Sequence, residues 1–190
     1  VEDGQTLVVP IIDRNIPAER VAWFPLDYYE NQPLAAVSLK NDSESSLPPG
    51  VITIYEVARG GENESIAFLG DARLGILPKG EERMVAYALD VKVTGEIDEE
   101  GSESHYSSFK IVDGFLETQS TKKTTYRITL KAPKEEDRLV VFEVDEYEDG
   151  TFIPPEGASV ARTSDAFRLR VPIKAGENRD VKAIFEEPQY

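Results

Sequence analysis

The chain has 190 residues, a formal net charge of −15 at pH 7, no cysteine and 40% hydrophobic residues. The length and apolar content predict a folded globular protein, whereas the acidic excess excludes nucleic acid as an expected partner. Disulfides, thiolate metal sites and thiol catalysis are excluded because there is no cysteine, and no apolar stretch reaches the ~18 residues needed to cross a bilayer.

The amino terminus begins at Val1, and the opening VEDGQ lacks the positive and apolar regions of a signal peptide. We therefore expect either a mature form or a piece of a longer protein.

Several segments in the first half of the chain have the composition of β-strands. The runs LAAVSLKN (34–41) and VITIYEV (51–57) are rich in β-branched and aromatic residues, which favour strands. The longer run ERMVAYALDVKVTGEI (82–97) predicts one long, bent strand, because the strand-like VKV follows directly and Gly80 and Gly95 bound the segment.

In the second half, residues 104–120 predict another long strand with a bulge or turn near Gly114. The segments TTYRITLKAP and AFRLRVPI alternate apolar and polar residues with period two, which is typical of a strand with one buried side. Pro172 predicts a sheet edge or a strand end. Further strands are expected at 138–144 and 181–187.

Strands every ten to fifteen residues, separated by loops rich in Gly, Pro, Asn, Asp and Ser, indicate an all-β fold. We predict an antiparallel β-sandwich with immunoglobulin-like elements. Residues 1–190 form a single β domain in this interpretation. The acidic stretch near 96–104 is either a seam between two lobes or a long hairpin loop within one domain.

Four stretches of the sequence carry a resemblance to a known family: LKNDSESSLPPGVITIYE, FLGDARLGILPKGEERMVAYALDVKV, TTYRITLKAP and DAFRLRVPIKAGE. Together they resemble the bacterial domain of unknown function found in mucoidy-inhibitor-type envelope proteins, over about Val21 to Phe185. The resemblance implies a β-sandwich and an extracytoplasmic location, in the periplasm or cell envelope. It implies no reaction and no catalytic residue.

A cluster of aromatic residues lies around Pro25, and its members are Trp23, Phe24, Tyr28 and Tyr29. Exposed aromatic rings beside carboxylates are typical of a surface that stacks on sugars. Burial of the same rings in the core is the alternative. The cluster therefore supports a hypothesis of a carbohydrate-binding module, or of a glycan hydrolase.

Asp145, Asp149 and Glu156 have offsets similar to those of a calcium-binding loop. Tyr147 occupies a position that needs a carboxylate or an amide, Pro154 and Pro155 restrict the loop, and the flanking segments have the pattern of strands instead of helices, so an acidic hairpin loop is the alternative. Calcium is the one cofactor that the sequence suggests.

His105 is the only histidine, and Ser104, Ser107 and Ser108 are close to it in sequence. General-base catalysis would need a convergent nucleophile and an oxyanion donor, and the sequence has no nucleophile-elbow pattern. Our leading hypothesis is therefore a non-enzymatic interaction or structural module of a cell-envelope protein, with a protein or polysaccharide partner.

Overall fold

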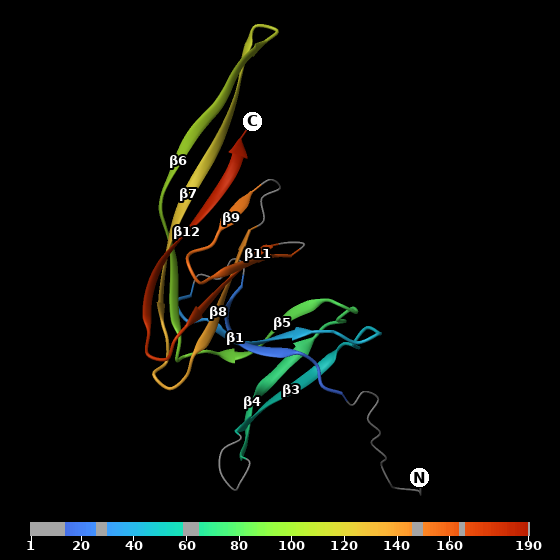
Figure 1. The fold of residues 1–190 in the computed structure, drawn as a ribbon. Helices are drawn as coiled ribbons and strands as arrows, with labels where there is room; N and C mark the ends of the chain where they lie inside the picture. Colours follow the sequence, from blue (N-terminus) through green and yellow to red (C-terminus); the bar gives the residue numbers. More distant parts are fainter. Residues whose placement is uncertain (1–13, 26–29, 59–64, 146–149, 164–165, 190) are drawn as a thin grey trace, which may run out of the picture.

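A computed structural model of the chain describes residues 14–25, 30–58, 65–145, 150–163 and 166–189, and Figure 1 shows its fold. The described residues form strands and loops, and they include no long apolar helix of the kind that spans a bilayer. The strands are β1 (Ala18–Phe24), β2 (Leu34–Lys40), β3 (Gly50–Ala58), β4 (Ser65–Leu74), β5 (Glu82–Leu89), β6 (Thr94–Val112), β7 (Phe115–Lys131), β8 (Arg138–Asp145), β9 (Thr151–Ile153), β10 (Ser159–Arg162), β11 (Ala166–Ile173) and β12 (Asn178–Gln189).

The strands form three sheets. The largest has six strands in the order β10-β11-β8-β1-β2-β5, the second has four in the order β6-β7-β12-β9, and β3 pairs with β4 as a two-stranded ribbon. The pairings are antiparallel, except that β1 lies parallel to β8. The chain is thus the all-β sandwich that the sequence predicts, with one parallel pair inside its larger sheet.

The main core lies between the six-stranded and four-stranded sheets. It is formed by inward-facing apolar side chains of both layers, of which the largest are Phe24, Phe142, Phe152, Phe167 and Phe185. Phe24 and Phe142 stack with their ring centroids 4.6 Å apart and their planes 8° apart. Burying such rings is the main favourable contribution to folding here.

A smaller apolar cluster packs the β3–β4 ribbon against β5, and the pairing register places it on the same side of the six-stranded sheet as Ala22 and Phe24 of the main core. Ala72 and Leu74 of β4 and Val85 of β5 are buried together. The ribbon approaches closely at Gly70, where an added Cβ would lie 2.6 Å from the carbonyl oxygen of Tyr87. Only glycine permits that approach without a shift of one strand.

Most of the predicted strands are confirmed. The predicted segments 34–41, 51–57, 138–144 and 181–187 correspond to β2, β3, β8 and β12. The alternation in 166–173 is confirmed as β11, where Phe167, Leu169 and Val171 are buried. Pro172 lies beyond the stretch of β11 that pairs with β10, as expected of a strand end.

The prediction of one strand over 82–97 is wrong. Strand β5 ends at Leu89, and β6 begins in the other sheet at Thr94. Between them the Asp90 carboxylate accepts a hydrogen bond from the backbone N–H of Lys92 at 3.0 Å, and Val93 is fully buried. An aspartate that bonds the backbone two residues on makes a turn without glycine or proline, so the segment lacks the usual signals of a turn.

The acidic stretch 96–104 lies within β6 and pairs with β7 instead of forming a loop. The turn expected near Gly114 is confirmed: Asp113 and Gly114 both have positive φ, 51° and 84°, and connect β6 to β7. Strands β6 and β7 form a long hairpin that rises beyond the rest of the molecule, whereas the β3–β4 ribbon lies at the opposite end (Figure 1). We call residues 101–125 of this hairpin the arm.

Candidate functional site

The arm has an apolar face that continues the core-facing side of β7. Ile128 and Leu130 of β7 are buried in the core. Because side chains alternate along a strand, Leu116, an even number of residues before Ile128, lies on the same side of β7. Leu116 pairs with Ile111, Thr118 with Phe109, and Ser120 with Tyr106. Cross-strand partners lie on the same side of a ribbon. Tyr106, Phe109, Ile111 and Leu116 therefore form one surface, the apolar face of the arm.

This apolar face is open to solvent. Tyr106 is 62% exposed, Phe109 65%, Ile111 76% and Leu116 63%. The rings of Tyr106 and Phe109 stack with centroids 5.6 Å apart, across the bulge between Tyr106 and Ser108. A contiguous exposed apolar surface on an otherwise acidic protein is typical of an interaction site.

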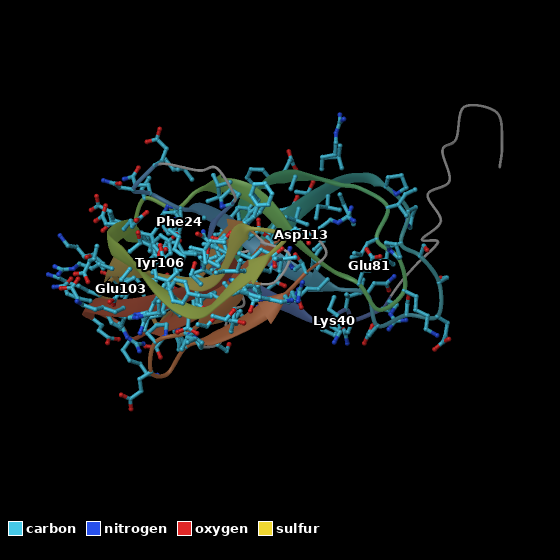
Figure 2. All side chains as sticks on the ribbon, turned by 90° about the horizontal axis from the view of Figure 1, so that it is seen from above. Phe24, Lys40, Glu81, Glu103, Tyr106 and Asp113 are labelled. Atoms are coloured by element: carbon cyan, nitrogen blue, oxygen red, sulfur yellow. The ribbon has the colours of Figure 1, made fainter. Side chains whose placement is uncertain are left out.

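The opposite face of the arm is mainly polar, although the exposed Phe115 pairs with Val112 on this face next to the turn. Lys110 pairs with Glu117 and Glu103 pairs with Lys123, so opposite charges lie across the two strands. His105, also on β6, has its Nε2 3.5 Å from Glu103 Oε2 and is exposed. Figure 2 shows the arm from above, with Glu103, Tyr106 and Asp113 labelled along it. The ribbon is amphipathic even though no described segment covers its apolar face.

The end of the arm has only two strands. Strand β12 accompanies β7 as far as the pair Gln189 and Ser120, and beyond this point β6 and β7 pair only with each other. A two-stranded ribbon in water is marginally stable unless its apolar face is covered. An additional layer packed on the apolar face would therefore stabilise the end of the arm.

A charge cluster fixes the base of the arm, next to the bulge between Glu99 and Gly101. The Glu100 carboxylate accepts hydrogen bonds from Arg127 Nε at 2.6 Å and contacts Lys182 Nζ at 2.6 Å. Lys182 and Arg127 together hold the pKa of Glu100 below its ordinary value. The cluster links β6, β7 and β12 where the arm leaves the sandwich.

A second exposed apolar surface lies on the outer side of the β3–β4 ribbon. Tyr55 and Phe68 pair across it with ring centroids 5.9 Å apart, and Val57 pairs with Ile66. Tyr55 is 57% exposed and Phe68 is 61% exposed. Because the inner side of this ribbon already packs on β5, its fold does not depend on covering the outer side.

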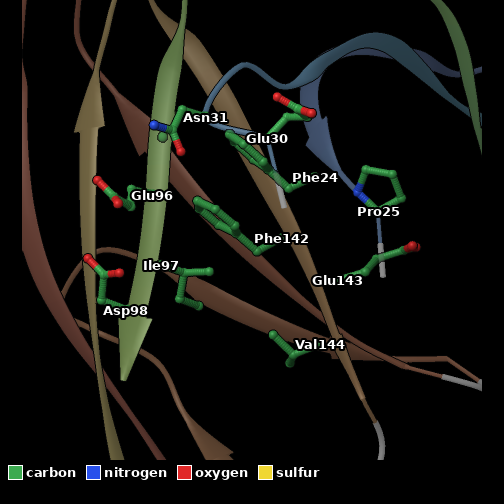
Figure 3. A pocket seen from close by; sticks show the side chains of 11 residues that line it. Phe24, Pro25, Glu30, Asn31, Glu96, Ile97, Asp98, Phe142, Glu143 and Val144 are labelled. Carbon is green, nitrogen blue, oxygen red and sulfur yellow. The ribbon is translucent and has the colours of Figure 1, made fainter. Parts of the chain in front are cut away.

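A cavity of about 350 Å³ opens at the end of the sandwich, between β1, β6 and β8. Figure 3 shows Phe24 and Phe142 in its centre, with Pro25 and Ile97 to either side and Glu30 at the rim. Its size falls within the range of small-ligand pockets, and its lining combines apolar and polar side chains in similar measure.

The other carboxylates beside this cavity belong to its outer wall. Glu96 and Asp98 alternate with the inward-facing Ile97 and pair with residues on the outer side of β7. Glu143 forms an ion pair with Arg168 at 2.9 Å. Glu30 is therefore the carboxylate at the rim of the cavity, and Phe24 and Phe142 form its apolar centre.

The predicted aromatic cluster is divided by the alternation of β1. Phe24 is 5% exposed and belongs to the main core, whereas Trp23 is half-buried on the opposite side of the sheet, against Val21 and Met84. These two rings therefore do not share one stacking surface. Tyr28 and Tyr29 lie outside the described residues, so the sugar-binding hypothesis stays a prediction.

The predicted calcium site falls mostly outside the described part of the chain. Asp149 is not described, the backbone of Asp145 ends β8, and Glu156 is exposed after β9. In the parts of the chain that the structure describes, no three His, Cys, Asp or Glu side chains gather as metal ligands. The calcium site stays a prediction, and thermal melts with calcium and with a chelator test it.

The sequence analysis did not identify the apolar face of the arm. The signal was present: an Asp-Gly turn places Val112 opposite Phe115 in a two-residue hairpin, and this register aligns Ile111 with Leu116. The bulge near Ser107 shifts the alternation, so that Tyr106 and Phe109, three residues apart, face the same side.

Comparison with known proteins returned no match: no protein-family profile, no curated protein and no solved structure is significantly similar to this chain.

Proposed function

We propose that this chain is a non-enzymatic interaction module of a cell-envelope protein, and that it binds its partner through the apolar face of the arm. The observation that carries the proposal is the exposure of Tyr106, Phe109, Ile111 and Leu116 on one side of a projecting ribbon. The envelope location rests on the resemblance of the sequence to mucoidy-inhibitor-type envelope proteins.

The form of the arm supports a role in binding a partner rather than a role limited to extending the sheet of this chain. A ribbon that only extended a sheet would need no apolar residues beyond Ser120, where β12 ends. Exposed aromatic and aliphatic side chains raise the risk of aggregation, so their presence on one side indicates that a partner covers them.

Site-specific photocrosslinking in intact cells tests this role. A photoreactive phenylalanine replaces Phe109 on the apolar face, and the control replaces Glu117 on the polar face of the same arm. We expect a discrete covalent adduct from position 109 and at least about tenfold less from position 117. Equal labelling, or no adduct from either position, would contradict a docking role for the apolar face.

A carbohydrate-binding module is the second candidate, supported by the cavity beside Pro25 and Glu30. In this alternative a sugar ring enters the cavity next to Phe24, and the sequence offers Tyr28 and Tyr29 as candidate stacking residues. Binding to a glycan array by the full chain, compared with Tyr28→Ala and Tyr29→Ala variants and a Tyr55→Ala control, tests it. A binding signal that survives both tyrosine substitutions rules out the tyrosines as the platform.

A further inference from the structure

We infer that the partner on the apolar face of the arm is a second copy of this chain, bound through the same face in a two-fold, antiparallel dimer. The inference rests on the proposed function, since it identifies the occupant of the same surface. Its support comes from charge, from area and from the order of side chains along the arm.

The distribution of charge favours a copy of the chain. Within residues 101–125 three acidic residues, Glu103, Asp113 and Glu117, are balanced by three lysines, Lys110, Lys122 and Lys123. The net charge of −15 therefore resides entirely in the rest of the molecule. A basic partner would be attracted to that acidic part, whereas two acidic copies can meet at the neutral arm without repulsion between the surfaces in contact.

An antiparallel arrangement also separates the acidic bodies. If two arms pack side by side with their tips pointing in opposite directions, each body lies beyond the tip of the other arm (Figure 1). In a parallel arrangement the two bodies would be adjacent. Coulomb repulsion between two bodies of this charge falls with distance and with screening, so it selects the antiparallel dimer.

The exposed area is of the size that such a contact needs. At the exposed fractions observed, the four side chains of the apolar face present on the order of 500 Å². A standard interface buries about 800 Å² per partner. The remaining area is available from residues of the same side, including Thr118, Ser120 and Lys122, which adjoin the four.

The order of side chains is self-complementary. Phe109 lies in the middle of the apolar face, with Ile111 and Leu116 toward the tip and Tyr106 toward the base. A two-fold axis at Phe109 places Tyr106 of each copy over Ile111 and Leu116 of the other. Two ribbons packed in this way form a small two-layer sandwich, which covers the part of the arm that has only two strands.

Sedimentation equilibrium of the purified full chain tests the inference. We expect a dimer at tens of micromolar, and a double variant Phe109→Ser/Ile111→Thr with a dissociation constant at least about 100-fold higher. The matched control is Tyr55→Ser/Val57→Thr, which removes similar groups from the β3–β4 ribbon and should leave the dimer intact. Unchanged circular dichroism confirms that each variant is folded.

Because the chain has no cysteine, a single cysteine provides a second measurement that does not weaken the fold. Under mild oxidation Phe109→Cys should form disulfide-linked dimers at least about tenfold faster than Tyr55→Cys at the same concentration. Equal rates for the two variants would overturn the placement of the two-fold axis at Phe109.

The outcomes separate this inference from the proposed function. A purified chain that stays monomeric, with a photocrosslinked adduct of a different macromolecule at position 109, overturns the second copy but leaves the docking role. Masses that grow without limit, together with sensitivity to the Tyr55→Ser/Val57→Thr control, indicate head-to-tail contacts and also overturn the two-fold dimer. A monomer with no adduct at position 109 contradicts both.

Discussion

At the scale of single residues, Gly95 sets how closely β6 can approach the main core. A Cβ added at Gly95 would lie 2.8 Å from Cζ of Phe24 and 2.9 Å from Cδ2 of Leu130. Both neighbours are themselves buried, so neither side chain can move away freely. The absence of a side chain at this position permits the stacking of Phe24 on Phe142.

We therefore expect Gly95→Ala to lower the free energy of unfolding by about 1–3 kcal/mol, the usual cost of overpacking a core. Urea unfolding measures the difference. Gly101→Ala, in the same strand, is the control, because no atom lies within 4 Å of its added Cβ, and its midpoint should not fall. An unchanged midpoint for Gly95→Ala would mean that the two sheets can separate at little cost.

A second residue-scale feature is the buried cation Arg138 on β8. Its side chain is 4% exposed, and it lies 3.6 Å from Asp90 and contacts Glu136. The hydrogen bond from Arg138 holds the pKa of Glu136 below its ordinary value. A carboxylate whose pKa is lowered by folding stabilises the native state above its unfolded pKa of about 4.3, and this contribution is lost as the pH falls through the lower, folded pKa.

Glu136→Gln should consequently reduce stability at about pH 7 and weaken the loss of stability between about pH 7 and about pH 3.5. The amide no longer titrates, while Arg138 keeps Asp90 as its one remaining close carboxylate among the described residues. Urea midpoints at the two pH values give the comparison, with Glu99→Gln as a control at an exposed position. The same pH dependence in Glu136→Gln as in the original chain would show that other carboxylates account for acid unfolding.

At the scale of elements, the hairpin of β6 and β7 depends on its turn. Asp113 and Gly114 have φ values of 51° and 84°, as a two-residue turn matching the twist of the strands requires. The turn fixes the register of the whole arm, including the pairing of Ile111 with Leu116. A different register would move one strand's apolar residues to the polar side.

Gly114→Ala should destabilise the end of the arm by about 1 kcal/mol, since an L-residue at this positive φ is strained. The effect should be local. Amide hydrogen exchange in residues 107–119 should become about fivefold faster, and the global unfolding midpoint should stay the same. Asp113→Asn is the control, because asparagine accepts positive φ readily. Faster exchange throughout the four-stranded sheet would instead show that the arm and the sandwich unfold together.

At the scale of the whole molecule, acidic charge and apolar surface are segregated. The arm is neutral, whereas the rest of the chain carries the net charge of −15. The negative charge of the body favours solubility and repels other copies of the chain. Because the arm projects from the body, an apolar contact at the arm lies away from this repulsion (Figure 1).

This segregation predicts the salt dependence of self-association. Raising the salt concentration from about 0.03 M to about 0.3 M shortens the screening length from roughly 18 Å to roughly 6 Å, so repulsion between the bodies weakens while the apolar contact is retained. The dissociation constant of the dimer should fall several-fold. Sedimentation at the two concentrations measures it, and weaker association at high salt would indicate a contact between opposite charges instead.

The sequence by itself determined those features that depend on neighbouring residues. Alternation in 166–173 predicted the buried side of β11, and Gly114 predicted the bulge or turn that the structure shows as the turn between β6 and β7. These signals are local because side chains alternate within one strand and because a turn's φ values depend on its own residues. They were sufficient for an all-β sandwich.

The tertiary structure alone decided which strands are neighbours and where apolar surface stays uncovered. Nothing within β1 indicates that it pairs in parallel with β8, which is more than a hundred residues away, and the turn after Asp90 lacks glycine and proline. Ile128 and Leu116 lie on the same side of β7, yet Ile128 is buried in the core and Leu116, in the arm, is exposed. A strand's own residues predict an apolar side, but only the packing of distant elements determines whether another layer covers it.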